Sequence, residues 1–141
     1  MSKLTIKVMR HVRDQIEQAT KELKAMDAKK GKYHGALAFS HWAEWNLMAY
    51  VNQEARLAEW EQFKASIEAR LKEGYEDDNI VRWIEGWRDG LVEIVMGGYA
   101  QHSTNQIANM IEAEKIDVKR KMAGMRMIDS GSLEELLSNL K

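Results

Sequence analysis

The sequence of 141 residues contains no cysteine and no proline. The lack of cysteine excludes a disulfide framework, catalysis by a thiolate, zinc held by cysteine ligands and iron–sulfur clusters. The lack of proline removes the residue that most often breaks a helix, so long helices are permitted almost anywhere in the chain. Together, the two absences permit a helical fold and remove thiol chemistry from its functions.

The chain also lacks a strong charge imbalance, because 21 Lys and Arg residues face 22 Asp and Glu residues. A net charge of −1 removes the basic profile of most non-specific nucleic-acid binders, although local patches remain. No apolar run reaches about 18 residues, and no secretion signal opens the chain. We therefore expect a cytoplasmic protein that does not enter a membrane.

Several motifs of enzymes and nucleotide-binding proteins are missing as well. The chain has no Gly-x-Ser-x-Gly turn for a nucleophilic serine, no Walker A loop and no Gly-x-Gly-x-x-Gly fingerprint for phosphates. The Glu-x-x-His motif of ferritin-like di-iron bundles does not occur either. We therefore predict a protein without catalytic residues, cofactor or metal.

Apolar residues recur at helical spacing through most of the chain. A heptad seam predicts a first helix over residues 2–26, with Met9, Val12, Ile16, Ala19, Leu23 and Met26 on one face. A second, very long helix is predicted over residues 36–72, before a C-cap glycine. Its first part, 35–51, is apolar around most of its circumference, so we expect it at the centre of the core.

The second half of the chain predicts three more helices. Acidic residues 76–78 precede a third helix with the stripe Ile80, Trp83, Ile84, Trp87, Leu91, Ile94 and Val95. Gly97 and Gly98 either end this helix or pack closely inside it, and the sequence does not decide between the two. Capping boxes at Ser103 and Ser132 open a fourth helix and a short C-terminal one.

These elements predict an all-α fold, a single-domain antiparallel bundle of four longer helices plus a short C-terminal helix. The bundle is expected over residues 1–128, with its fourth helix ending at 129–131, and residues 129–141 form a short amphipathic helix or tail. We expect the bundle to stay folded without 129–141, whether that segment docks in cis or in trans. Because segment 35–51 needs more cover than a small chain gives, a homodimer is the first expectation.

Tryptophan, methionine and leucine side chains are the candidates for protein contacts. The pairs Trp42–Trp45 and Trp83–Trp87 have helical neighbour spacing, and we expect them to face each other and join two helices. Part of such a cluster can also be an interface hot spot. The candidate protein-interaction residues are Trp42, Trp45, Met122, Met125, Leu133, Leu136, Leu137 and Leu140.

Two basic clusters, at residues 21–32 and 115–126, stand out within the neutral chain. If the helices that carry them lie side by side, one patch could contact several phosphates, with a strong salt dependence. A charge run is more often a solvated helix face. The candidate nucleic-acid contacts are Lys29, Lys30, Lys32, Lys119, Arg120, Lys121 and Arg126.

His41 and Glu44 interrupt the most apolar stretch and lie three residues apart, so they can share one helix face. If they are buried, such a pair supports a metal or acid–base site. A carboxylate metal site in a bundle, however, needs about four to six ligands from several helices. A structural pair or an exposed seam is therefore the simpler interpretation.

The sequence thus favours a non-catalytic, cytoplasmic, helical interaction protein that self-associates, such as an adaptor, an assembly factor or an inhibitor of another protein. One alternative is an accessory nucleic-acid-binding protein that uses the two basic clusters. A second alternative is a small metal or acid–base enzyme around His41 and Glu44. The partner, the oligomer number and a cellular or viral origin do not follow from the residues.

Overall fold

The computed structural model describes residues 1–31, 35–97, 105–125 and 130–141, with the backbone alone for Trp45. Over these ranges the protein is all-helical, as predicted, and contains no strand. The helices are α1 (Lys3–Lys30), α2 (Ala36–Lys72), α3 (Asp77–Gly97), α4 (Gln106–Ala123) and α5 (Leu133–Leu140). Within this part of the chain, no helix is both long and apolar enough to cross a membrane.

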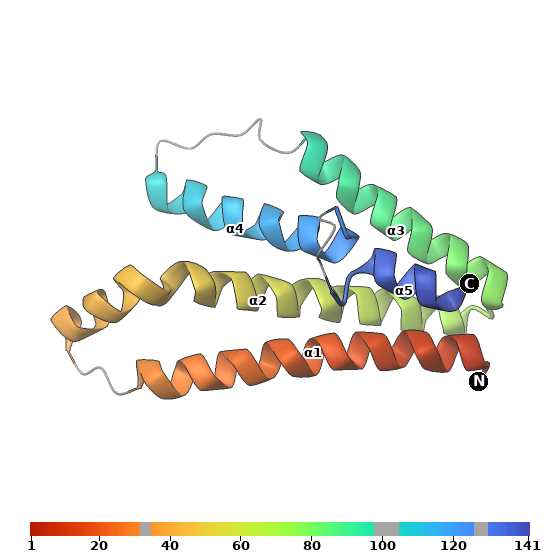
Figure 1. The fold of residues 1–141 in the computed structure, drawn as a ribbon, viewed down its shortest axis with the longest axis horizontal. Helices are drawn as coiled ribbons and strands as arrows, with labels where there is room; N and C mark the ends of the chain where they lie inside the picture. The colour runs from red at the N-terminus through yellow and green to blue at the C-terminus, as the bar shows by residue number, and fades with distance from the viewer. Residues whose placement is uncertain (32–34, 98–104, 126–129) are drawn as a thin grey trace.

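Two helical hairpins make up the body of the molecule (Figure 1). The antiparallel helices α1 and α2 extend along its length, and α3 and α4 form the second hairpin. α4 packs on α2 with both helices running in the same direction, while α3 diverges from α2 towards its C-terminal end. α5 contacts both α1 and α3 and fills the space between them. The all-α class is therefore confirmed, whereas a regular four-helix antiparallel bundle is not.

Local signals set the ends of the first three helices. Ser2 caps α1, because its Oγ accepts a backbone N–H of the first turn at 3.1 Å. α1 continues to Lys30, past the predicted end at Met26, and α2 has the predicted bounds. Asp77 and Asp78 lie in the first turn of α3, where the helix dipole favours negative charge.

The connection between α3 and α4 answers part of the question that the sequence left open. α3 ends at Gly97, and Gly98 lies outside the described residues. α4 begins after Asn105, whose side-chain oxygen accepts two backbone N–H groups of the first turn. The predicted cap Ser103 is also outside the described ranges. α3 and α4 are therefore separate helices.

α4 ends earlier than the sequence predicts. Its last residue is Ala123, and the predicted end at 129–131 is wrong, because Gly124 adopts a left-handed conformation with φ 84°. A Cβ added at Gly124 would lie 2.6 Å from the Cβ of Glu134 and 2.9 Å from the Oγ of Ser132. The end of α4 and the start of α5 are thus in close contact, which only glycine permits.

The core lies in the half of the molecule that contains α5. It is built from the first half of α1, the second half of α2, most of α3, the end of α4, and α5. Its fully buried side chains include Val8, Val12, Phe63, Ile67, Ile80, Ile84, Leu133, Leu136 and Leu137. The expectation that segment 35–51 forms the core centre is wrong, because α3 diverges and leaves that part of α2 flanked by α1 and α4.

The predicted contact of the pair Trp42–Trp45 with the pair Trp83–Trp87 is also wrong. Trp83 and Trp87 pack on Phe63 of α2, with ring centroids 5.1 Å and 5.6 Å away. Trp42 lies in the other half of α2, where it packs on two different aromatic rings. Roughly 30 Å of helix separates Trp42 from Phe63 at 1.5 Å per residue, so the two aromatic clusters are distinct.

α5 docks on its own chain. Leu133, Leu136 and Leu137 are at most 2% exposed and belong to the common core. An isolated helix of eight residues is marginal in water, so these contacts hold α5 in its helical form. Removal of residues 129–141 would uncover the core. Whether residues 1–128 fold independently of this segment stays a prediction, and the burial of these leucines argues against it.

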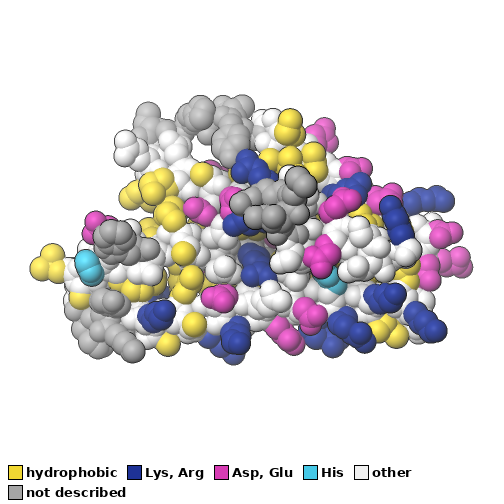
Figure 2. All heavy atoms as spheres, in the orientation of Figure 1, with side chains coloured by type: hydrophobic (Ala, Val, Ile, Leu, Met, Phe, Trp, Pro, Cys, Tyr) yellow, Lys and Arg dark blue, Asp and Glu magenta, His cyan; other side chains and the backbone are white. Residues whose placement is uncertain are grey.

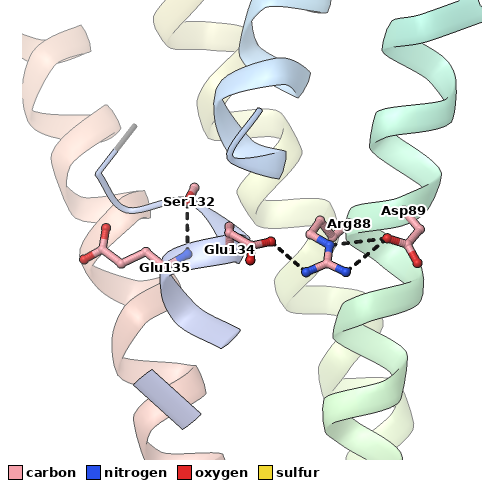
Figure 3. A network of polar contacts seen from close by, with 5 residues as sticks. All are labelled: Arg88, Asp89, Ser132, Glu134 and Glu135. Atoms are coloured by element: carbon pink, nitrogen blue, oxygen red, sulfur yellow. Dashed lines mark hydrogen bonds and ion pairs between the residues drawn. The ribbon is translucent and has the colours of Figure 1, made fainter. Parts of the chain in front are cut away.

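Polar contacts fix the start of α5 against α3 (Figure 3). The Oγ of Ser132 accepts the backbone N–H of Glu135 at 3.2 Å, which confirms the predicted capping box on its N-cap side. Arg88 of α3 donates from Nη1 to Glu134 Oε2 at 2.7 Å and from Nη2 to Asp89 Oδ1 at 3.2 Å. Burial alone would lower the pKa of Arg88. The hydrogen bonds to Asp89 and Glu134 have the opposite effect, and the net result is a raised pKa.

Candidate functional site

The structure buries most of the predicted protein-interaction residues whose side chains it describes. Those with a described side chain are either buried or half-buried. The buried ones are Trp42, Met122, Leu133, Leu136 and Leu137, the half-buried ones are Met125 and Leu140, and the side chain of Trp45 lies outside the described part. Apolar periodicity identifies the covered face of a helix but not which chain covers it. While the fold is intact, the five buried residues are therefore not a free surface.

The two basic clusters do not come together into one patch. The described candidates are Lys29, Lys30, Lys119, Arg120 and Lys121, whereas Lys32 and Arg126 lie outside the described ranges. The end of α1 lies at one end of the molecule, and the end of α4 lies near its middle (Figure 1). Several of these lysines are also in ion pairs: Lys30–Asp27 (3.3 Å), Lys121–Asp117 (2.8 Å) and Lys119–Glu59.

His41 and Glu44 do not converge with further ligands in the described part of the chain. Both side chains are exposed on the first half of α2. Among the described residues, no group of three or more His, Asp or Glu side chains could hold a metal ion. The geometry therefore adds no support to the metal or acid–base alternative.

Apolar side chains are exposed where α2 and α4 begin. Leu37 and Phe39 of α2 are 89% and 47% exposed, and Ile107 and Met110 of α4 are 60% and 49% exposed. Both helix starts lie at the same end of the molecule (Figure 1), and Figure 2 shows hydrophobic side chains gathered over that end, at the left. We call these four residues the apolar end. It lies away from the half that contains α5 and the core.

A polar cavity of about 310 Å³ lies between α1, α2, α4 and the turn at residues 130–131. Helical spacing explains how its polar lining forms, because Gln15 and Gln18 are three apart on α1, and Gln53 and Arg56 are three apart on α2. Residues of α4 complete the lining. Three helices and the turn before α5 therefore form the cavity together. We call it the Arg56 cavity.

Arg56 is half-buried and donates only to neutral groups. Its Nη2 donates to Gln15 Oε1 at 2.8 Å and to Gln18 Oε1 at 3.0 Å, and its Nη1 lies 3.5 Å from Gln53 Oε1. Arg56 makes no ion pair with any described residue. Burial lowers the pKa of Arg56, and the charge of Glu22 opposes this effect.

The turn at Gly131 forms one side of the Arg56 cavity and is tied to α1. Its carbonyl accepts a hydrogen bond from His11 Nε2 at 2.9 Å, and its N–H donates to Glu135 Oε2 at 2.5 Å. Gly131 has φ 76°, and an added Cβ would lie 2.6 Å from Gln15 Oε1. Gln15 thus contacts both the turn and Arg56, so the position of the turn and the lining of the cavity depend on each other.

The carboxylates of α4 near the Arg56 cavity already have partners. Asn52 Nδ2 donates to Glu114 Oε2 at 2.8 Å and to Asp117 Oδ2 at 3.1 Å. Asp117 also pairs with Lys121, a residue of the cavity lining. Among the described residues that line the cavity, none is an acid. The charged residues of this described lining, Arg56 and Lys121, are therefore both cationic.

Sequence reasoning missed Arg56, because it is one of many polar residues on a helix with no motif around it. One sequence signal was available at Gln15, which follows the seam residue Val12 by three positions and so belongs near the buried face. In the structure Gln15 is only 7% exposed. A buried glutamine requires hydrogen-bond partners. Which helix supplies the partner depends on tertiary packing, so the signal could not have identified Arg56.

Comparison of the chain with protein-family models, with curated proteins and with solved structures found no match. An all-α fold does not by itself define a function, because function resides in sites carried by the fold. The apolar end and the Arg56 cavity are two features of the described chain on which a function can be based.

Proposed function

We propose that this chain is a non-catalytic helical interaction protein that self-associates through the apolar end. The oligomer that we propose first is a homodimer. The observation that carries the proposal is the exposure of Leu37, Phe39, Ile107 and Met110 at the starts of α2 and α4. Exposed groups of apolar side chains on a folded protein mark interaction sites. An adaptor, an assembly factor or an inhibitor of another protein, acting in the cytoplasm, would use such a surface.

A second copy of the chain suits the apolar end, because a twofold interface places the same surface on both subunits. Segment 35–51 is apolar around most of its circumference, yet Leu37 and Phe39 within it stay exposed beside α1 and α4. Pairing with the same segment of a second copy would cover the sides that α3 and α5 leave open. Each Å² of apolar surface removed from water contributes about 25 cal/mol.

Sedimentation velocity over a range of protein concentrations tests this proposal with the variant Ile107→Glu. We expect the wild-type chain to dimerise and the variant to stay monomeric, because burial of an unpaired carboxylate in an apolar interface is costly. Ile6→Glu is the matched control, since Ile6 is 43% exposed on α1, whose start lies at the opposite end of the molecule. This control should dimerise as the wild type does.

Two results would contradict the proposal. One is a wild-type chain that remains monomeric at every concentration. The other is an Ile107→Glu variant that associates as strongly as the wild type, which would place the contact elsewhere on the surface. Circular dichroism of each variant checks that the helical fold is retained.

A further inference from the structure

We propose that the Arg56 cavity binds a small organic anion, whose carboxylate or phosphate oxygens pair with the Arg56 guanidinium. The proposal is independent of the apolar end and of self-association. It is based on three observations: an arginine that makes no ion pair with a described residue, a cavity beside it, and a described lining in which the charged residues are Arg56 and Lys121.

The charge of Arg56 is the first argument. A cation that is partly removed from water is ordinarily paired with an anion, since its desolvation is otherwise uncompensated. Here the guanidinium meets only the amide oxygens of Gln15, Gln18 and Gln53. Glu114 and Asp117 are held by Asn52, and Asp117 also by Lys121. Glu22 acts on Arg56 by its charge without forming an ion pair with it, so an incoming anion would supply a direct ionic partner.

The hydrogen bonds of Arg56 to Gln15 and Gln18 also join α2 to α1, so a purely structural role has to be considered. In a purely structural role, the side chains around Arg56 would pack closely and fill the space between the helices. Instead, a cavity of about 310 Å³ lies beside the guanidinium. This volume is at the lower end of the range for small-molecule pockets, about 300–1,000 Å³. It fits a small molecule and not a helix or a nucleic-acid strand.

The lining also indicates the class of ligand. The planar guanidinium fork matches the geometry of carboxylate and phosphate groups. Because the oxygens of Gln15, Gln18 and Gln53 accept from Arg56, their amide NH₂ groups remain as further donors. The apolar side chains in the lining are Trp60, Val118 and Met122. They suit a hydrocarbon or aromatic body attached to the oxyanion.

Nuclear magnetic resonance titration of the full chain tests the proposal with defined probes. The probes are benzoate, phenyl phosphate and inorganic phosphate, with benzamide as the neutral control. We expect saturable shifts at the Arg56 Nε–H and the Trp60 indole with benzoate or phenyl phosphate, and none with benzamide. The tighter of the two organic probes identifies the oxyanion, and weaker binding of inorganic phosphate shows the contribution of the organic body.

The variant Gln18→Glu makes the test specific to the charge of Arg56. Gln18 is exposed, and its Oε1 lies 3.0 Å from Arg56 Nη2, so a carboxylate there supplies the counter-charge within the chain. We expect probe binding to weaken at least about tenfold, the effect of losing a hydrogen bond to a charged group. Gln62→Glu is the matched control, because Gln62 is exposed on α2 and does not line the cavity.

Arg56→Met removes the cation itself and should abolish binding, whereas Arg70→Met on the same helix should preserve it, because Arg70 pairs with Glu73 outside the cavity. If Arg56→Met does not fold, the comparison of Gln18→Glu with Gln62→Glu decides the question. The absence of saturable binding of every anionic probe to the wild type would overturn the proposal. Equal binding by the wild type and Gln18→Glu would overturn it as well.

Discussion

Gly124 and Gly74 both have a positive φ, 84° and 89°, but they lie in different surroundings. Alanine at either position costs about 1–2 kcal/mol of left-handed strain. At Gly124 the new Cβ would also lie 2.6 Å from Glu134 Cβ, whereas at Gly74 nothing lies within 4 Å. In urea denaturation we expect Gly124→Ala to lower the free energy of unfolding by at least about 1 kcal/mol more than Gly74→Ala. Equal losses would show that crowding between α4 and α5 is unimportant.

A contact between Asp27, Lys30 and Tyr50 joins the end of α1 to α2. Tyr50 Oη donates to Asp27 Oδ1 at 2.7 Å, and Lys30 Nζ lies 3.3 Å from the same oxygen. The hydrogen bond from Tyr50, and then that from Lys30, lowers the pKa of Asp27. A carboxyl with a lowered folded-state pKa stabilises the fold above its ordinary pKa of about 3.9. This stabilisation is lost as the pH falls through the folded-state value.

Tyr50→Phe removes the hydroxyl donor and keeps the aromatic ring. We expect the pKa of Asp27 to rise towards its ordinary value, because the largest cause of its lowering is gone. A carbon-detected NMR titration of the carboxyl group measures this pKa directly. Tyr75→Phe is the control, since Tyr75 is on the loop before α3 and should leave Asp27 unaffected. An unchanged Asp27 pKa in Tyr50→Phe would refute the assigned cause.

At the scale of the element, α5 is a structural part of the core. Leu136 is 2% exposed, whereas Ser138 is exposed on the same helix. We expect Leu136→Ala to cost about 2–5 kcal/mol through lost apolar burial and the cavity it leaves. Ser138→Ala should stay within about 0.5 kcal/mol of the wild type. Thermal unfolding followed by circular dichroism compares the two, and a loss at Leu136 as small as that at Ser138 would mean that α5 does not stabilise the core.

The ends of helices were predictable where the deciding chemistry is local. The bounds of α2 and the cap at Ser132 depend on residues within one turn, so the sequence contains the necessary information. The end of α4 at Gly124 was missed, because in the sequence Gly124 resembles Gly86 and Gly90, which lie inside α3. Its left-handed conformation accompanies close contact with α5, which no local pattern encodes.

Contacts between helices were less predictable for the same reason. Trp42 and Phe63 both belong to apolar faces of α2, yet the direction of α3 brings only Phe63 to Trp83. Arg56 likewise acquires its surroundings from α1 and α4 as well as from its own helix. Apolar periodicity predicts that a face is covered, but the path of each neighbouring helix decides what covers it.

At the scale of the whole molecule, the two halves differ in how well they are covered. The half that contains α5 has contributions to its core from every helix. In the other half α3 has diverged, and the starts of α2 and α4 expose apolar side chains such as Leu37 and Ile107. One half therefore supplies the stability of the single chain, and the other half is the place where a second copy would add to it.

This division predicts that stability depends on protein concentration. Since association stabilises the folded state by mass action, the midpoint of thermal unfolding should rise with wild-type concentration and stay constant for Ile107→Glu. Added sodium chloride should preserve the dependence, because salt screens ion pairs and leaves apolar contacts intact. This sets self-association apart from the alternative function, because binding of nucleic acid through Lys29 or Arg120 would weaken steeply with salt. Calorimetry at several concentrations and two ionic strengths measures this, and a constant wild-type midpoint would count against dimerisation.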